Sequence, residues 1–230
     1  MIVIIGSPAW RTLPTPAPAG RACGIALAAA SRGAKVEVVG RVGEDPAGDA
    51  LLIALSSAGV GHATVLRDPT RPTVVIEPPP AVPLEDDEAS LFADPAPAAA
   101  SVTAALATSA GPRLDGADID LAVKYLEPSG VLVVSDDVPP DALAAAVTAG
   151  GYATLRLVVL LAPGGLAARS LPVGLPADAT VLAAPDHGDD AGAFEALVGA
   201  YAAALDAGAE PAAAFAAAQG GTGWEPAPSD

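Results

Sequence analysis

The sequence predicts an α/β fold in which helices cover both faces of a mainly parallel sheet. Residues 2–5 form an unbroken apolar run, which is typical of a strand buried on both faces. Residues 35–39 alternate polar and apolar side chains and lead through a glycine-rich loop into a helix pattern. Between residues 118 and 161, helix and strand patterns alternate. Such alternation gives βαβ units, and these units build a parallel sheet between two layers of helices.

The loop at 40–48 joins the clearest strand of the chain to its clearest helix. Its glycines permit close backbone approaches that a Cβ would forbid. Asp45 is placed to accept hydrogen bonds from the first amides of the helix, and Pro46 suits the first helical position because its missing N–H costs nothing there. We expect the helix to run to Ala58 and to stop at Gly59.

The remaining elements are predicted in the same way, from hydrophobic periodicity and from the glycines and prolines that end helices and strands. Residues 78–115 are dominated by proline, alanine and acidic side chains, so we expect an irregular segment there. Ligands of parallel sheets bind at the carboxyl ends of the strands, which would place Asp136 and Asp137 near a pocket. We expect further helices at 25–32, 119–126 and 140–149, and further strands at 63–66, 73–77, 131–134 and 155–161.

Length and charge restrict the class of protein. A chain of 230 residues can bury one substantial core, and we expect a single domain over 1–230. Eleven basic against 27 acidic residues give a formal charge of −16, which argues against nucleic acid or an anionic membrane as a partner. Cys23 is the single cysteine, and we expect it to be a small buried side chain. Without a targeting signal or a membrane-span pattern, we expect a cytoplasmic protein.

Residues 33–48, followed by Ala58-Gly59-Val60, closely resemble the ribokinase-like (PfkB) family of sugar and nucleoside kinases. That family has Leu-Gly-Ala, a hydrophobic strand, Gly-x-Val-Gly-x-Asp-x-x-Gly, a helix and Gly-Val in this region. The resemblance implies a three-layer α/β/α fold with a small β-lid, whose strands would lie within 10–20 and 63–77. It also implies transfer of a phosphoryl group from ATP, with Mg²⁺, to a sugar or nucleoside hydroxyl.

The sugar-binding positions of the family are only partly kept. The family's aspartate after the first strand corresponds to Arg11, and a guanidinium has no acceptor for a hydroxyl proton. In the stretch where the family has Gly-Gly-x-Gly-x-Asn, only Gly20 matches, and Gly24 stands in the place of the asparagine. The resemblance assigns Gly20 and Asp45 to substrate binding.

A second partial match lies at the start of a late helix. Gly192-Ala193-Phe194-Glu195 aligns with the family's Gly-Ala-Gly-Asp, whose amides form an anion hole and whose aspartate is the catalytic base. The resemblance therefore assigns Gly192 and Ala193 to nucleotide binding and Glu195 to catalysis. Phe194 adds a side chain where phosphate must approach, and Glu195 would move the base by about 1 Å, which can cost roughly 10²-fold in rate. Alternatively, Glu195 is a first-turn acid that the helix dipole stabilises.

These departures lead to two hypotheses. The leading one is a degenerate family member that lacks ordinary kinase activity and binds a small polar ligand or acts as a partner subunit. It is favoured by the short stretch between Ala162 and Asp186, which contains no Asn-x-x-Glu motif for the metal and phosphates. The alternative is an active sugar or nucleoside kinase that uses ATP and Mg²⁺, with Glu195 as the base. No protein-bound metal is expected, and a homodimer through the lid strands is a further expectation.

Overall fold

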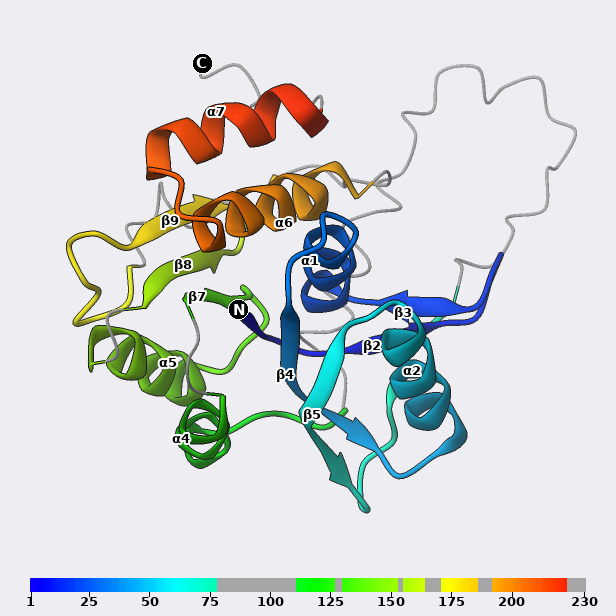
Figure 1. The fold of residues 1–230 in the computed structure, drawn as a ribbon. Coiled ribbons are helices and arrows are strands. Elements are labelled where there is room, and N and C mark those ends of the chain that lie inside the picture. The colour runs from blue at the N-terminus through cyan, green and yellow to red at the C-terminus, as the bar shows by residue number, and fades with distance from the viewer. Residues whose placement is uncertain (78–110, 127–129, 153–154, 164–170, 186–191, 223–230) are drawn as a thin grey trace, which may run out of the picture.

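The computed structural model describes residues 1–77, 111–126, 130–152, 155–163, 171–185 and 192–222 (Figure 1). The predicted irregular segment at 78–115 lies mostly outside these residues. The strands are β1 (Ile2–Ile5), β2 (Ala9–Arg11), β3 (Ala17–Ala19), β4 (Val36–Gly43), β5 (Gly61–Asp68), β6 (Val74–Ile76), β7 (Val131–Val134), β8 (Arg156–Leu161) and β9 (Thr180–Ala183). The helices are α1 (Arg21–Ala30), α2 (Pro46–Ser57), α4 (Gly116–Tyr125), α5 (Pro140–Tyr152), α6 (Ala193–Asp206) and α7 (Pro211–Thr222).

The main sheet has six strands in the order β5-β4-β1-β7-β8-β9, and every neighbouring pair is parallel. The apolar strand β1 lies in its interior, paired with β4 on one side and β7 on the other. Ile2 and Ile4 pack into the core beneath α1 and α6, whereas Val3 and Ile5 face the core shared with α4 and α5. The strand period of two thus distributes one apolar run between two cores.

Helices lie on both faces of this sheet. Figure 1 shows α1, α6 and α7 on one side and α4 and α5 on the other. Tyr201 of α6 links the main sheet to α7. Its hydroxyl is hydrogen-bonded to Thr180 of β9 at 2.8 Å, and its ring packs edge to face against Phe215 of α7 with the ring centres 5.7 Å apart. The predicted three-layer α/β/α fold is therefore confirmed. Among the described helices, none is long and apolar enough to cross a bilayer.

A second, three-stranded sheet has the order β3-β2-β6, with β2 antiparallel to β3 and parallel to β6. This sheet is formed from residues 9–19 and 74–76, within the ranges where the resemblance predicts a β-lid, and we call it the lid sheet. The expectation that 63–66 forms a lid strand is wrong, because these residues lie in β5 at the edge of the main sheet. The reason is the crossover through α2, since a strand-helix-strand connection normally returns its second strand to the same sheet.

Several element boundaries differ from the predicted ones. Helix α1 begins at Arg21 rather than at residue 25, and α4 begins at Gly116. The earlier start of α4 follows from a capping box, in which Asp115 accepts from the Asp118 amide while the Asp118 side chain accepts from the Asp115 amide. Strand β9 and helix α7 were not expected from the sequence.

Candidate functional site

Three charged side chains meet where β7 ends and where α1 and α6 begin. Arg21 is the first residue of α1, Asp136 follows β7, and Glu195 lies in the first turn of α6. The Arg21 Nε atom lies 2.7 Å from Asp136 Oδ1, a close ion pair without the alignment of a hydrogen bond, and its Nη1 atom lies 3.5 Å from Glu195 Oε1. The side chains are 11%, 1% and 20% exposed, respectively. The guanidinium thus joins two carboxylates in a largely buried place, which we call the crevice cluster.

The Phe194 ring packs against the guanidinium of this cluster. Its side chain is buried in the core between the sheet and the helices α1 and α6. The Arg21 guanidinium carbon lies 5.2 Å from the centre of the Phe194 ring, within the range of a cation–π contact. The residue that replaces the family's glycine therefore contributes an aromatic support for the guanidinium.

Glu195 lies directly over a glycine of the neighbouring helix. A Cβ built on Gly24 would be 2.8 Å from Glu195 Cγ, which is closer than packed side chains come. Gly24 stands where the family has asparagine, so the missing side chain leaves the space that the longer acid occupies. The two helices also approach closely at Gly199, where a Cβ would be 2.7 Å from Ala28 Cβ.

Asp137 adds a third carboxylate next to the crevice cluster. The Ser7 amide donates to both of its oxygens, at 3.4 Å to Oδ1 and 3.2 Å to Oδ2. Burial, and then the charge of the adjacent Asp136, raises the pKa of Asp137 to about 6. Burial likewise raises the pKa of the Cys23 thiol to about 12, so Cys23 is a neutral, buried side chain as expected from the sequence.

Asp45 does not join this cluster. Its carboxylate caps α2 by accepting from the Gly48 amide at 2.8 Å, and it also accepts from the amide and hydroxyl of Thr73 at 2.7 and 2.8 Å. Burial opposes ionisation of Asp45, but these hydrogen bonds outweigh it and lower the pKa of the carboxyl. The resemblance assigned Asp45 to substrate binding, and that role stays a prediction. In the structure, its contacts hold the segment that leads into lid strand β6.

The other predicted site residues lie around the two helix starts. Gly20 is the N-cap of α1, with a positive φ of 84°, and Gly192 is the N-cap of α6, with a φ of 69°. Ala193 is the first residue of α6. The structure therefore brings Gly20, Gly192, Ala193 and Glu195 to one end of the sheet, while their roles in binding stay predictions. Arg11 is exposed in lid strand β2.

Sequence reasoning missed the role of Arg21. It occupies a variable position of the glycine-rich stretch, so no motif pointed to it. The position of Asp136 two residues after a buried strand was a usable signal, and the structure confirms that it lies at the carboxyl end of β7. Within the part of the chain that the structure describes, no group of three or more His, Cys, Asp or Glu side chains is arranged to hold a metal ion.

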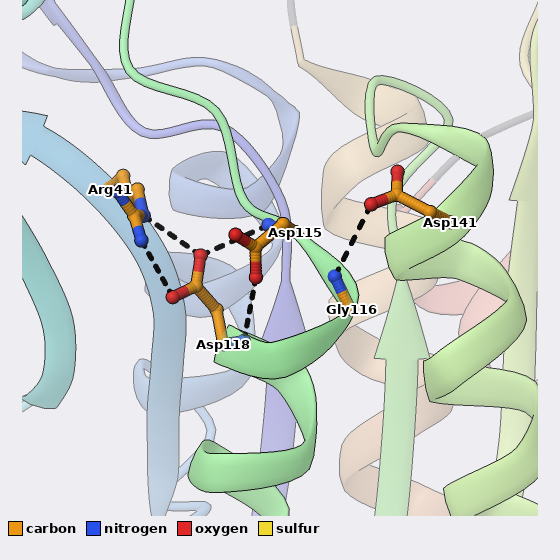
Figure 2. A network of polar contacts seen from close by, with 5 residues as sticks. All are labelled: Arg41, Asp115, Gly116, Asp118 and Asp141. Atoms are coloured by element: carbon orange, nitrogen blue, oxygen red, sulfur yellow. Dashed lines mark hydrogen bonds and ion pairs between the residues drawn. The ribbon is translucent and has the colours of Figure 1, made fainter.

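A separate network ties β4 to α4 on the opposite side of the sheet (Figure 2). Arg41 makes a bidentate pair with Asp118, with Nε at 2.8 Å and Nη2 at 2.7 Å from its oxygens. The hydrogen bond to Asp118 raises the pKa of Arg41. The neighbouring Asp141 side chain accepts from the Gly116 amide at 3.4 Å. Because the Asp118 carboxylate is also engaged in the capping box, this network is a structural connection and not a ligand site.

Comparisons with known proteins agree with this fold. The family model described as pfkB family carbohydrate kinase matches residues 14–77. Ribokinase of Arabidopsis thaliana, solved with ribose and ATP, is 14% identical, with a TM-score of 0.61 over 96% of this chain and 90% of that chain. The PfkB protein of Polaromonas sp. JS666 is 16% identical, with a TM-score of 0.63 over 94% and 92%. An Escherichia coli protein assigned as ribokinase II, solved with ATP and Mg²⁺, is 14% identical, with a TM-score of 0.64 over 94% and 89%.

Comparison with curated proteins gave no match. The parallel sheet between two layers of helices gives the chain the fold of these solved structures. Its resemblance to the ribokinase-like (PfkB) family is confirmed by the family match over residues 14–77 and by the fold shared with the ribokinases.

Proposed function

We propose that this chain is a PfkB-type protein that binds a small polar molecule at the crevice cluster and lacks ordinary kinase activity. The observation that carries the proposal is the ion pair between Arg21 and Glu195 at 3.5 Å. A general base must reach and accept the proton of the attacking hydroxyl. Here one oxygen of the only acid in the first turn of α6 already faces a guanidinium, which a second carboxylate holds in place at 2.7 Å.

The polar lining supports ligand binding at this position. The cluster lies at the carboxyl end of the interior strand β7, where ligands of parallel sheets bind. It combines a guanidinium with two carboxylates and a third one nearby, and Glu195 keeps 20% of its side chain exposed. Charged groups of this kind are usual at binding sites, since a structural core rarely contains them.

An active kinase is the second candidate. It is favoured by the position of Glu195 in the first turn of α6, where the helix amides and dipole attract a phosphoryl group. The ribokinases of similar fold were solved with ATP, and one also with Mg²⁺. In this case ATP and Mg²⁺ would be the cofactors, and a sugar or nucleoside the acceptor.

The test combines calorimetric titration with ATP and Mg²⁺ and a coupled assay of ADP release over a panel of sugars and nucleosides. We expect ADP release at the background rate for every acceptor. Release that is lost in Glu195→Gln would overturn the proposal and favour the active kinase. The matched control is Asp49→Asn, because Asp49 is an exposed acid in the first turn of α2 and Asn also removes one charge there.

A further inference from the structure

The described residues of the crevice cluster and its surroundings carry more negative than positive charge. Asp136, Asp137 and Glu195 contribute carboxylates, and Arg21 is the guanidinium that pairs with two of them. A largely buried site weakens screening by solvent, so an imbalance of charge acts strongly on any molecule that enters it. A ligand of matching chemistry would bring positive charge.

Asp136 provides the second and independent observation. Its side chain is 1% exposed, and its two oxygens have different surroundings. Arg21 approaches Oδ1 at 2.7 Å, and the Ser135 hydroxyl lies 3.4 Å from the same atom. Oδ2 is buried and has no hydrogen-bond partner among the residues that the structure describes. Buried carboxylate oxygens are normally satisfied, so an unmatched one at the end of a sheet strand indicates a place for an external donor.

We infer that the ligand of this crevice carries a protonated amine, which makes an amino sugar or a comparable small polar amine its chemical class. The inference rests on the proposed function and specifies its ligand. An ammonium group supplies both a positive charge and three N–H donors. A hydrogen bond from it to Asp136 Oδ2 would give that oxygen a partner.

Other ligand chemistries fit less well. A neutral sugar hydroxyl can donate to Asp136 Oδ2 but leaves the excess negative charge in place. A phosphorylated sugar adds negative charge beside three carboxylates, and the guanidinium that would attract it is already paired with Asp136 and Glu195. The raised pKa of Asp137 agrees with this picture, because it reflects burial and the charge of Asp136.

The test is calorimetric titration of the full chain, near neutral pH, with glucosamine, galactosamine, their parent sugars, glucose 6-phosphate and Mg²⁺ alone. We expect each amino sugar to bind at least about tenfold more tightly than its parent, since a charged donor forms the stronger hydrogen bond. Asp136→Asn keeps the shape and removes the charge, so it should weaken binding of each amino sugar more than binding of its parent and abolish most of this preference. Asp49→Asn, on the exposed surface of α2, should change neither.

Equal affinity for amine and parent, tighter binding of glucose 6-phosphate, or saturable binding of Mg²⁺ that competes with glucosamine would each overturn the inference. A preference that survives in Asp136→Asn would do the same, provided thermal melting shows that the variant is folded. ADP release with ATP would overturn only the proposed lack of kinase activity. The preference for amines would then be measured as a lower KM for each amino sugar than for its parent sugar. Binding of none of the sugars or amines would overturn both proposals.

Discussion

Glu195 and Gly24 show how two departures from a family pattern form one packing unit. Considered separately, a longer acid misplaces a base and a glycine loses the hydroxyl contact of an asparagine. In the structure, the Glu195 side chain fills the space at Gly24, where a Cβ would be 2.8 Å from its Cγ. Arg21 then pairs with the carboxylate at 3.5 Å. The two departures therefore fit together beside a guanidinium, which a comparison of single positions does not reveal.

Asp137 permits a prediction of stability against pH. Its folded-state pKa of about 6 lies above the ordinary value of 3.8, so between these values the folded chain binds more protons than the unfolded chain. This carboxyl group's contribution to the free energy of unfolding should therefore fall as the pH rises from about 4 to 6 and stay level above. Asp137→Asn should be more stable than the parent by up to about 3 kcal/mol at pH 7, and the difference should vanish near pH 4.

Urea unfolding at intervals between pH 4 and pH 8 measures this difference. Asp120→Asn is the matched control, because Asp120 is an exposed acid on α4. The control should follow the parent at every pH. An Asp137→Asn variant that is no more stable than the parent at pH 7 would contradict the assignment of a buried, charge-coupled carboxyl group.

At the scale of elements, the packing of α1 against α6 positions the crevice cluster. Arg21 lies in the first turn of α1 and Glu195 in the first turn of α6, so the distance between the two helix axes sets the separation of this ion pair. Gly199 permits the close approach, because a Cβ there would lie 2.7 Å from Ala28 Cβ and 2.8 Å from the Ile25 carbonyl oxygen. A backbone atom cannot be moved aside as a flexible side chain can, so any larger residue must separate the helices.

Gly199→Ala should therefore lower the free energy of unfolding by about 1 to 3 kcal/mol, the usual cost of overpacking. Chemical denaturation measures the loss. Gly220→Ala is the control within α7, where the added Cβ meets no atom within 4 Å. That variant should gain up to about 1 kcal/mol from helix propensity. A neutral effect of Gly199→Ala would mean that the two helices can separate freely.

The elements differ in how well the sequence predicts them, for physical reasons. Strands β1 and β7 have the predicted bounds, because burial on both faces requires an unbroken apolar run. The predicted bounds of helix α2 were accurate to one residue at its end. Asp45 and Pro46 mark its start, and a glycine follows its end. Strand β9 is only half-buried along its length, and so its pattern is weak.

The site was predicted less well than the fold. The start of α6 with Glu195 was found from the motif, whereas the start of α1 was predicted four residues too late. The pairing of Arg21 with Asp136 and Glu195 joins three elements that are far apart in sequence. A pattern along the chain does not encode such contacts, which depend on the register of packed elements. The contacts of Asp45 with Thr73 were missed for the same reason.

At the scale of the whole molecule, the lid is connected to the main sheet through a few polar contacts. Thr73 is buried and stands directly before β6. Its hydroxyl accepts from the Gly43 amide at 2.9 Å and donates to Asp45 at 2.8 Å. The end of β4, the start of α2 and the approach to the lid are therefore held at one point. Lid orientation depends on this point, since β6 pairs with β2 in the second sheet.

Within the described residues, the lid sheet leaves apolar surface and strand edges available to a second copy. Strand β2 has a neighbour on each side, whereas β3 and β6 each pair with β2 alone. Val75 in β6 is 41% exposed, and Leu13, which follows β2, is 55% exposed. Open strand edges beside exposed apolar side chains are suited to pairing with another chain. We therefore retain the predicted homodimer through the lid, with its contacts on β2, β3 and β6 and not on β5.

Val75→Lys tests this arrangement. A lysine at the centre of the short edge strand β6 would bring its charge and that of its symmetry mate into one interface, so the dimer dissociation constant should rise at least about tenfold. Light scattering during size-exclusion chromatography measures the mass over a range of concentrations. Ile53→Lys is the control, because Ile53 is also apolar and 68% exposed but lies on α2. A parent chain that is monomeric at every concentration would exclude the dimer. If both variants raised the dimer dissociation constant equally, the interface would not be specific to the lid, since only Val75 belongs to it.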